Sequence, residues 1–279
     1  FNLGGPATRK IYRATTGDFR SWTSPPELVH APTEEEIRRV AAGGVFSGFD
    51  YYNTSTLRYP YAAKVYLMFP STFYHYASPA LPRHAGPLDV TLAVSRDGIE
   101  WRRVGTEPFI PLGLSGSDDG GAIYVARGLV RTGDELSLYY TGHPGTHGGP
   151  VQGTAPGLEP GYFDAYATRA VLRLDGFVSA DAGPDGGELT TPVVTFAGTR
   201  LELNVDTSAG GVARVELLDR SGRRVPGFSI EDCDPINGNF IRHSVSWKGN
   251  TDVSALRAQP IRARFVMQDA RLYAFQFAR

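Results

Sequence analysis

Short segments that alternate apolar and polar residues, separated by turns rich in glycine and proline, run along most of the chain. This pattern is typical of β-strands joined by tight connections. Helical signals are found at residues 32–40, where Thr33 can cap a helix with an acidic first turn that Gly43-Gly44 would end. The sequence therefore predicts an all-β protein with one short helix.

One motif, [S/T]-x-D-x-x-x-W, recurs at a near-fixed interval. It occurs around Asp18 and Asp97, with a degenerate copy around Asp175, at steps of 79 and 78 residues. A constant step of this kind marks a repeated supersecondary unit. Asp18 and Asp97 can accept backbone N–H groups in Asx-type turns, so we interpret them as structural rather than catalytic.

Each repeat has room for four antiparallel strands, which is the blade of a β-propeller. The first repeat is cut in half, so residues 1–182 are predicted to form the C-terminal part of a propeller, about two and a half blades. A closed propeller needs at least about four blades. The chain begins at Phe1 rather than Met, and we expect the other blades in an N-terminal segment or on a second chain. The predicted strands are residues 10–14, one near Trp22, 50–57, 63–69, 90–95, 100–104, 122–131, 135–141, 167–174 and 177–180.

The sequence pattern changes after Ala182, where the glycine- and proline-rich residues 183–187 are typical of a linker or turn. Short alternating strands follow, and Arg220-Ser221-Gly222 reads as a hairpin turn between two of them. Strands at this spacing favour a β-sandwich over residues 183–279. The predicted strands are residues 193–196, 200–206, 212–218, 244–247, 261–268 and 273–277.

Composition limits the function classes. The net charge of −1 argues against a nucleic-acid or anionic-membrane partner, and no apolar run is long enough to cross a bilayer. The single cysteine, Cys233, excludes an intrachain disulfide and leaves the compartment undecided, with a secreted or periplasmic location favoured. Nearly all basic residues are arginine, which is typical of a bacterial genome rich in G and C.

The paired Asp–Trp turns, the Leu138-Tyr139-Tyr140 strand and the trailing β-sandwich resemble the clan of five-bladed β-propeller glycoside hydrolases, such as families 32 and 43. Residues 176–233, with Gly176-Phe177-Val178-Ser179 and Glu231-Asp232-Cys233, look like a group of bacterial, planctomycete-type proteins usually classed as family-32-like. The resemblance covers residues 9–279 and implies hydrolysis of glycosidic bonds. In families 32 and 43 a catalytic carboxylate lies in the first blade, and this chain has no counterpart of that blade.

Candidate catalytic acids lie where the first strand of a blade begins, because that edge faces the propeller funnel. Glycoside hydrolysis uses two carboxylates, one as general acid and one as nucleophile or base. Asp50 and Asp119 occupy matched positions in neighbouring repeats, and Glu107 lies just upstream of the second. The alternative is that Asp118 and Asp119 only cap a turn before Gly120-Gly121.

Two connections, residues 70–88 and 142–166, are longer than a hairpin requires, and loops of that length are usually functional or disordered. Aromatic residues among polar groups suit stacking on a sugar. Their candidate sugar-binding residues are Tyr74, His75, Arg83 and His143.

The sequence contains only weak signals for a metal or cofactor site. His75, His143 and His147 fit no strong zinc spacing, and Pro144 breaks any helix between the last two. The acidic turn at residues 231–234 could hold a structural Ca²⁺ through oxygen ligands, although a solvated or arginine-paired loop is the simpler interpretation. We therefore expect no cofactor.

Three hypotheses follow from the sequence. The first is a glycoside hydrolase that acts on a poly- or oligosaccharide through a carboxylate pair. The second is a non-catalytic carbohydrate-binding propeller, suggested by the absent first-blade carboxylate. The third is a structural half-propeller that another chain completes.

Overall fold

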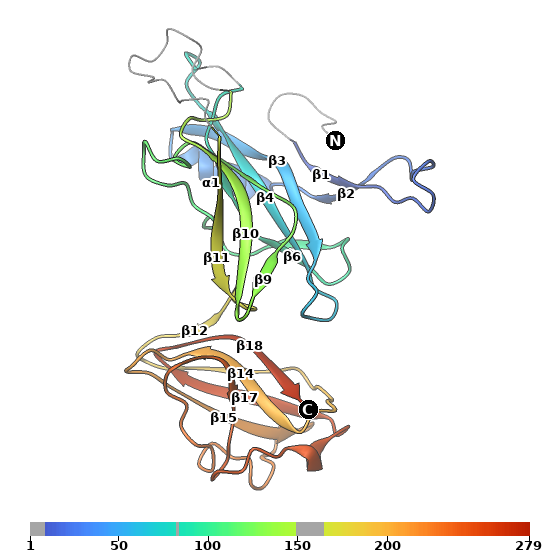
Figure 1. The fold of residues 1–279 in the computed structure, drawn as a ribbon, viewed down its shortest axis with the longest axis vertical. Helices are drawn as coiled ribbons and strands as arrows, with labels where there is room; N and C mark the ends of the chain where they lie inside the picture. The colour runs from blue at the N-terminus through green and yellow to red at the C-terminus, as the bar shows by residue number, and fades with distance from the viewer. Residues whose placement is uncertain (1–8, 82–83, 149–164) are drawn as a thin grey trace. The chain divides into compact units, whose positions relative to one another are not determined.

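The computed structural model describes residues 9–81, 84–148 and 165–279, and nearly all of its regular elements are β-strands (Figure 1). The prediction of an all-β protein is therefore confirmed. Contacts divide the chain into two compact units. The first is Phe1–Thr132 with Leu136–Val171, and the second is Gly133–Glu135 with Leu172–Arg279.

The first unit contains an antiparallel meander that follows the strand order predicted for the second repeat. Strand β3 pairs with β4, β4 pairs with both β5 and β6, and β6 pairs with β7. The prediction placed residues 73–76 in a long loop, and this is wrong because β4 continues through them. The strands are β3 (Phe46–Arg58), β4 (Tyr66–Tyr76), β5 (Leu88–Val90), β6 (Ala93–Ser95) and β7 (Trp101–Arg103).

A second antiparallel group joins this meander. Strand β10 lies between β8 and β11 and also pairs with β9, while β5 and β8 pair in parallel at Leu88 and Ala122. The predicted fourth strand at residues 177–180 does not join this sheet, because β12, which begins at Ala180, pairs with β18 of the second unit. None of the sheets in the described residues closes on itself. The strands are β8 (Ala122–Val125), β9 (Val130–Thr132), β10 (Glu135–His143) and β11 (Tyr166–Arg173).

The half repeat at the start forms a separate two-stranded sheet. Strand β1 (Ile11–Arg13) pairs with β2 (Glu27–His30), so the prediction of a strand near Trp22 is wrong. The Asx-type turns are confirmed. Asp18 Oδ1 accepts the N–H groups of Arg20 and Ser21, both at 2.8 Å, and Asp97 Oδ1 accepts the corresponding N–H groups of its own turn at 2.8 and 2.9 Å.

The predicted helix is confirmed as α1 (Glu34–Ala42). Thr33 Oγ1 accepts the Glu36 N–H at 3.2 Å, and Glu36 Oε2 accepts the Thr33 N–H at 2.8 Å, which is a complete capping box. Ile37 and Val40 pack against the buried cluster of Ile11, Phe49, Tyr51, Met68 and Ala93. Packing of this apolar stripe, together with the cap, holds a helix that would be too short to persist alone.

Replacing Thr33 with alanine should therefore weaken α1. Loss of a threonine N-cap costs about 1 kcal/mol, equivalent to roughly fivefold faster exchange of the helix amides if they open locally. Hydrogen–deuterium exchange of the peptide covering residues 34–44 measures this. Thr106→Ala is the matched control, since Thr106 is exposed, its side chain hydrogen-bonds its exposed neighbour Glu107, and its bond to Arg103 uses the main-chain carbonyl that alanine keeps. Equal exchange in both variants would contradict the prediction.

The second unit contains two antiparallel sheets that share one buried apolar cluster, to which Leu203 and Leu272 contribute from one sheet and Val215 and Phe265 from the other. Pairing runs in the order β12-β18-β14-β16 in the first sheet and β13-β17-β15 in the second. The strands are β12 (Ala180–Ala182), β13 (Gly187–Thr190), β14 (Arg200–Asp206), β15 (Val212–Asp219), β16 (Asn239–Ser244), β17 (Ile261–Gln268) and β18 (Ala270–Ala278).

Several predicted strands of the second unit differ from the observed ones. Residues 193–196 contribute only an isolated bridge between Val194 and Ile261, and β13 begins inside the predicted linker. Residues 244–247 mostly follow β16 rather than form a strand of their own. A short 3₁₀ helix, η1 (Ser254–Leu256), completes the unit. Neither α1 nor η1, the helices within the described residues, qualifies as a membrane span by length and hydropathy.

Candidate functional site

Asp50 lies at the centre of the candidate site. It sits in β3 opposite Phe73 of β4, and it is only 1% exposed. Its Oδ1 accepts Arg9 Nε at 2.9 Å, and its Oδ2 lies 3.0 Å from His75 Nε2. Because side chains alternate along a strand and paired residues share a face, Asp50, Phe73 and His75 project to the same side of the sheet.

Aromatic rings surround this ion pair. The Arg9 guanidinium lies 4.6 Å from the ring centroid of Tyr52 and 4.7 Å from that of Phe73. Phe73 also meets His75 edge-on, with 4.6 Å between ring centroids. Cation–π contacts of this kind fix the orientation of the guanidinium as well as adding attraction.

Residues from β8, β10 and the loop that follows complete the group. Tyr124 Oη lies 2.7 Å from His147 Nδ1, and the His147 ring lies 4.4 Å from that of Tyr52 and 5.3 Å from that of Phe73. His143, at the end of β10, meets Tyr124 edge-on at 5.4 Å. We call this set the Asp50 cluster, and its members are Arg9, Asp50, Tyr52, Phe73, His75, Tyr124, His143 and His147.

Electrostatics set the protonation of the Tyr124–His147 pair. Burial lowers the pKa of His147, and the charges of Arg9, His84 and His143 lower it further. Burial raises the pKa of Tyr124 to about 12, so its hydroxyl keeps its proton at neutral pH. Tyr124 therefore donates to Nδ1 of a neutral His147, which leaves the Nε2–H of His147 as a hydrogen-bond donor.

A close approach of two loops places His147 in the cluster. Gly86 and His147 form an antiparallel bridge in which each N–H donates to the other carbonyl, at 3.0 and 2.9 Å. A Cβ on Gly86 would lie 1.9 Å from the Tyr74 carbonyl oxygen, so only glycine fits there. Gly148 has a φ of +75°, and a Cβ on it would lie 2.1 Å from the His84 carbonyl oxygen. The two glycines are thus what permits the bridge.

Asp119 lies in the loop before β8 and is half-buried. Its Oδ2 accepts the Tyr140 hydroxyl at 2.8 Å, and its Oδ1 accepts Ser117 Oγ at 3.0 Å. Its Cβ lies against Gly142, the residue before His143, where an added Cβ would come within 2.7 Å. Asp119 therefore borders the end of β10 that carries His143, and it also stabilises its own loop.

The other predicted site residues lie elsewhere. Tyr74 projects to the opposite face of β4, where its hydroxyl donates to Asp89 Oδ2 at 2.9 Å. Glu107 is exposed after β7 and hydrogen-bonds the adjacent Thr106 at 3.3 Å, and none of its contacts within the described residues reaches the Asp50 cluster. Arg83 lies outside the described residues. Of the predicted residues, the structure brings Asp50, His75 and His143 together.

Sequence reasoning missed four members of the cluster. Tyr52 and Phe73 could have been found, because each lies two residues from a predicted site residue in a strand and so shares its face. Arg9 and Tyr124 carry no local signal, since they reach the site through long-range contacts. His147 was recognised in the second long connection and as a possible metal ligand, but it was not among the predicted sugar-binding residues.

The structure also shows what surrounds the residues that the sequence offered as metal ligands. Within the described residues, no group of three or more His, Cys, Asp or Glu side chains is arranged to hold a metal ion. The acidic turn pairs with cations and donors of the protein itself: Glu231 bonds Arg224 at 3.0 Å, Asp232 pairs with Lys248, and Asp234 accepts the Gly249 N–H at 2.8 Å. This is the loop paired with basic residues that the sequence offered as the simpler interpretation.

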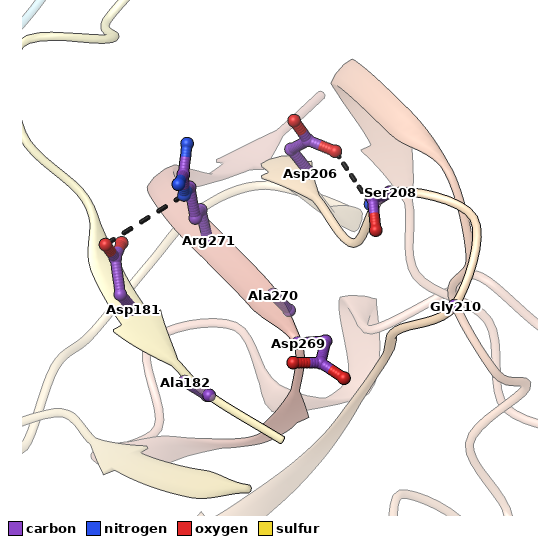
Figure 2. A pocket seen from close by; sticks show the side chains of 9 residues that line it. Asp181, Ala182, Asp206, Ser208, Gly210, Asp269, Ala270 and Arg271 are labelled. Carbon is purple, nitrogen blue, oxygen red and sulfur yellow. Dashed lines mark hydrogen bonds and ion pairs between the residues drawn. The ribbon is translucent and has the colours of Figure 1, made fainter.

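The second unit has a pocket of its own, with a cavity of about 570 Å³ (Figure 2). Arg271 lies between Asp181 and Asp206 in the strand register, and its Nε is 4.0 Å from Asp181 Oδ2. None of the described residues that line this pocket is aromatic. It therefore lacks the stacking surface that the Asp50 cluster provides.

Comparisons with known proteins assign no family, because no family model and no curated protein matches the chain. The chemistry of the Asp50 cluster is therefore the basis for a functional assignment.

Proposed function

We propose that the Asp50 cluster binds a carbohydrate. The observation that carries this proposal is the buried Asp50 carboxylate, which pairs with Arg9 and hydrogen-bonds His75, bounded by the rings of Tyr52, Phe73 and Tyr124. Aromatic rings stack on the C–H faces of sugars, and a few fixed polar groups orient the hydroxyls. Tyr52 is 38% exposed, so its ring remains accessible to a ligand.

In this proposal Asp50 is a positioning residue. Both of its oxygens already accept hydrogen bonds, and its side chain is 2% exposed, so it has little capacity to attack a sugar. It holds Arg9 and His75 in fixed orientations instead. Within the described residues, His147 Nε2–H, His143 and the Tyr52 hydroxyl have polar atoms without hydrogen-bond partners, and these atoms could bind sugar hydroxyls.

Hydrolysis of a glycosidic bond is the second candidate, and Asp119 is the observation that favours it. Asp119 is a half-buried carboxylate beside the strand end that carries His143. A glycoside hydrolase needs a second carboxylate. Asp50 is a poor candidate for it, because its two oxygens already bond Arg9 and His75. The resemblance to families 32 and 43 places the missing acid in a blade without a counterpart in this chain.

We also infer a finer description of the fold. The β3–β4–β5/β6–β7 meander has the connectivity of a propeller blade, and β8, β10 and β11 have that of three strands of the next. Further blades would come from an N-terminal segment or from a second chain. The two sheets of the second unit, which share one core, fit a β-sandwich.

Binding to a glycan array, followed by calorimetry with the best oligosaccharide, tests the proposed function. His147→Asn removes the Nε2 donor from its place, and we expect at least tenfold weaker binding, because a lost hydrogen bond in a desolvated site costs about 1.4 kcal/mol or more. Asp181→Asn, in the pocket of the second unit, is the control and should bind as the wild type does.

Release of reducing sugar from the same oligosaccharide separates the two candidates. Binding without release supports a binding protein. Release that Asp119→Asn abolishes, while calorimetric binding persists, establishes hydrolysis instead. A wild-type protein that binds no glycan would overturn both candidates.

A further inference from the structure

Two large aromatic side chains stand in solvent on the loop between β1 and β2. Phe19 is 84% exposed and Trp22 is 53% exposed. Their rings are perpendicular, with an interplanar angle of 79° and 6.2 Å between centroids. A pair of exposed aromatic rings on one loop is unusual enough to need an explanation, since single exposed apolar residues are common but clusters mark interaction sites.

The second copy of the turn provides an internal comparison. Asp18 and Asp97 accept the same two backbone N–H groups of their turns, so the two loops have the same local geometry. The residue after the aspartate is left-handed in both, with a φ of +56° at Phe19 and +77° at Gly98. Glycine adopts this conformation without steric cost, whereas a bulky residue is a genuine outlier there.

Phe19 therefore occupies a position that the turn itself would give to glycine. Its ring gains no burial in return, because most of its surface is exposed. Strain of this kind, without compensation in the fold, points to a role in an interaction.

The two tryptophans of the repeat differ in the same way. Trp101 packs against the buried cluster around Phe49 and Met68. Trp22 instead stays beside Phe19 at the loop tip. The first copy of the motif thus keeps the turn but directs both of its large rings outward.

We propose that the Phe19–Trp22 pair is a second carbohydrate-binding surface, which takes one sugar ring of a polysaccharide in the angle between the two aromatic rings. One ring would stack on the sugar's C–H face while the other contacts its edge. Exposed Arg20 and Ser21 offer hydrogen bonds to hydroxyls at the same loop tip. Within the described residues, Phe19 and Trp22 make their ring contact with each other and none with the Asp50 cluster, so this surface does not depend on the proposed function.

The charges of the loop favour a sugar over a lipid surface. Asp18 lies next to Phe19, and the Ser21 and Arg20 backbone N–H groups hold the pKa of its carboxyl below the usual range. Inserting Phe19 into a bilayer would bring this ionised carboxylate towards hydrocarbon, which is strongly unfavourable. A bound sugar leaves the carboxylate and Arg20 in water.

Co-sedimentation of the full chain with microcrystalline cellulose, insoluble xylan and inulin-coated beads tests the proposal, with phosphatidylglycerol vesicles as a fourth probe. We expect the wild type to bind at least one polysaccharide and Trp22→Ala to weaken that binding at least tenfold. Phe19→Gly installs the residue of the second copy, so it should weaken binding while its thermal midpoint stays equal or rises. Leu114→Ala, at another highly exposed apolar residue, is the control and should bind normally.

The two carbohydrate sites can be told apart. His147→Asn should leave co-sedimentation unchanged, and Trp22→Ala should leave oligosaccharide binding at the Asp50 cluster unchanged. Equal co-sedimentation of wild type, Trp22→Ala and Phe19→Gly with every polysaccharide would overturn the proposal. Binding to vesicles alone, or loss of self-association as the only effect of Trp22→Ala, would overturn it as well.

Discussion

Replacing Arg9 with methionine is expected to lower the free energy of unfolding of the first unit by about 3 kcal/mol, the lower end for a buried ion pair that loses one partner. The substitution leaves Asp50 almost completely buried with His75 as its remaining partner. Arg9 itself is 22% exposed, so water can replace part of its contribution. Methionine keeps most of the side-chain volume between Tyr52 and Phe73, so the loss reports the charge rather than a cavity.

Urea denaturation of the wild type, Arg9→Met, Asp50→Asn and the double variant measures this loss. The double variant should be more stable than Arg9→Met alone, because an amide is far cheaper to leave unpaired than a carboxylate. Arg20→Met is the matched control, since Arg20 is exposed on the neighbouring loop. An Arg9→Met loss no larger than that of Arg20→Met would mean that the ion pair does not hold the cluster together.

The elements that the sequence predicted well are those specified by local interactions. The capping box of Thr33 and Glu36 determines where α1 begins, and both Asx turns are complete within four residues. Strand alternation located β14, β15 and β17 within one residue at each end. In each case the signal and the structure lie in the same short segment.

The errors come from partners that are distant in the sequence. Residues 177–180 have the composition of a fourth blade strand, but the available partner for Ala180 is Leu272 of β18. Likewise Ile11 pairs with His30 across a loop, which leaves Trp22 without a strand. Pairing choices of this kind depend on tertiary contacts that local patterns do not encode.

The residues of the candidate site likewise fall into those with a local sequence signal and those that reach the site through long-range contacts. Asp50 and His75 were found because acids and histidines near strand starts stand out, whereas Arg9 reaches Asp50 across 41 residues. Tyr74 could have been separated from His75 by alternation, because neighbours in a strand face opposite sides. That distinction required β4 to be extended through residue 76, and the prediction ended it at residue 69.

Two further buried polar residues, Asp89 and His30, make the stability of the fold depend on pH. Asp89 accepts the Tyr74 hydroxyl on the face of β4 opposite His75. Asp89 is 6% exposed and His30 is 9% exposed, and Asp89 Oδ1 and His30 Nε2 have no hydrogen-bond partner among the residues that the structure describes. Burial raises the pKa of Asp89 to about 6, and burial lowers the pKa of His30 to about 4. Both shifts mean that the neutral form of each group is the one the fold prefers.

Asp89→Asn is expected to remove a pH-dependent loss of stability. Asp89 binds its proton more tightly when folded than when unfolded, where the reference pKa is 3.8. Its stabilising contribution is present below about pH 4 and is lost as the pH rises through about 6. Two pKa units correspond to at most about 3 kcal/mol. Asparagine still accepts the Tyr74 hydroxyl and never ionises, so the variant should gain up to this amount relative to the wild type between pH 4 and pH 7.

His30 provides the counterpart with the opposite sign. Its folded pKa lies below the reference value of 6.5, so its contribution is present above pH 6.5 and is lost as the pH falls through about 4. His30→Asn should therefore gain stability relative to the wild type towards low pH, whereas Asp89→Asn gains it towards neutral pH. Urea denaturation at half-unit steps from pH 4 to pH 7.5 measures both differences. Because the two groups oppose each other over the same interval, the wild type should show a flatter pH profile than either variant, and parallel profiles for all three proteins would exclude both assignments.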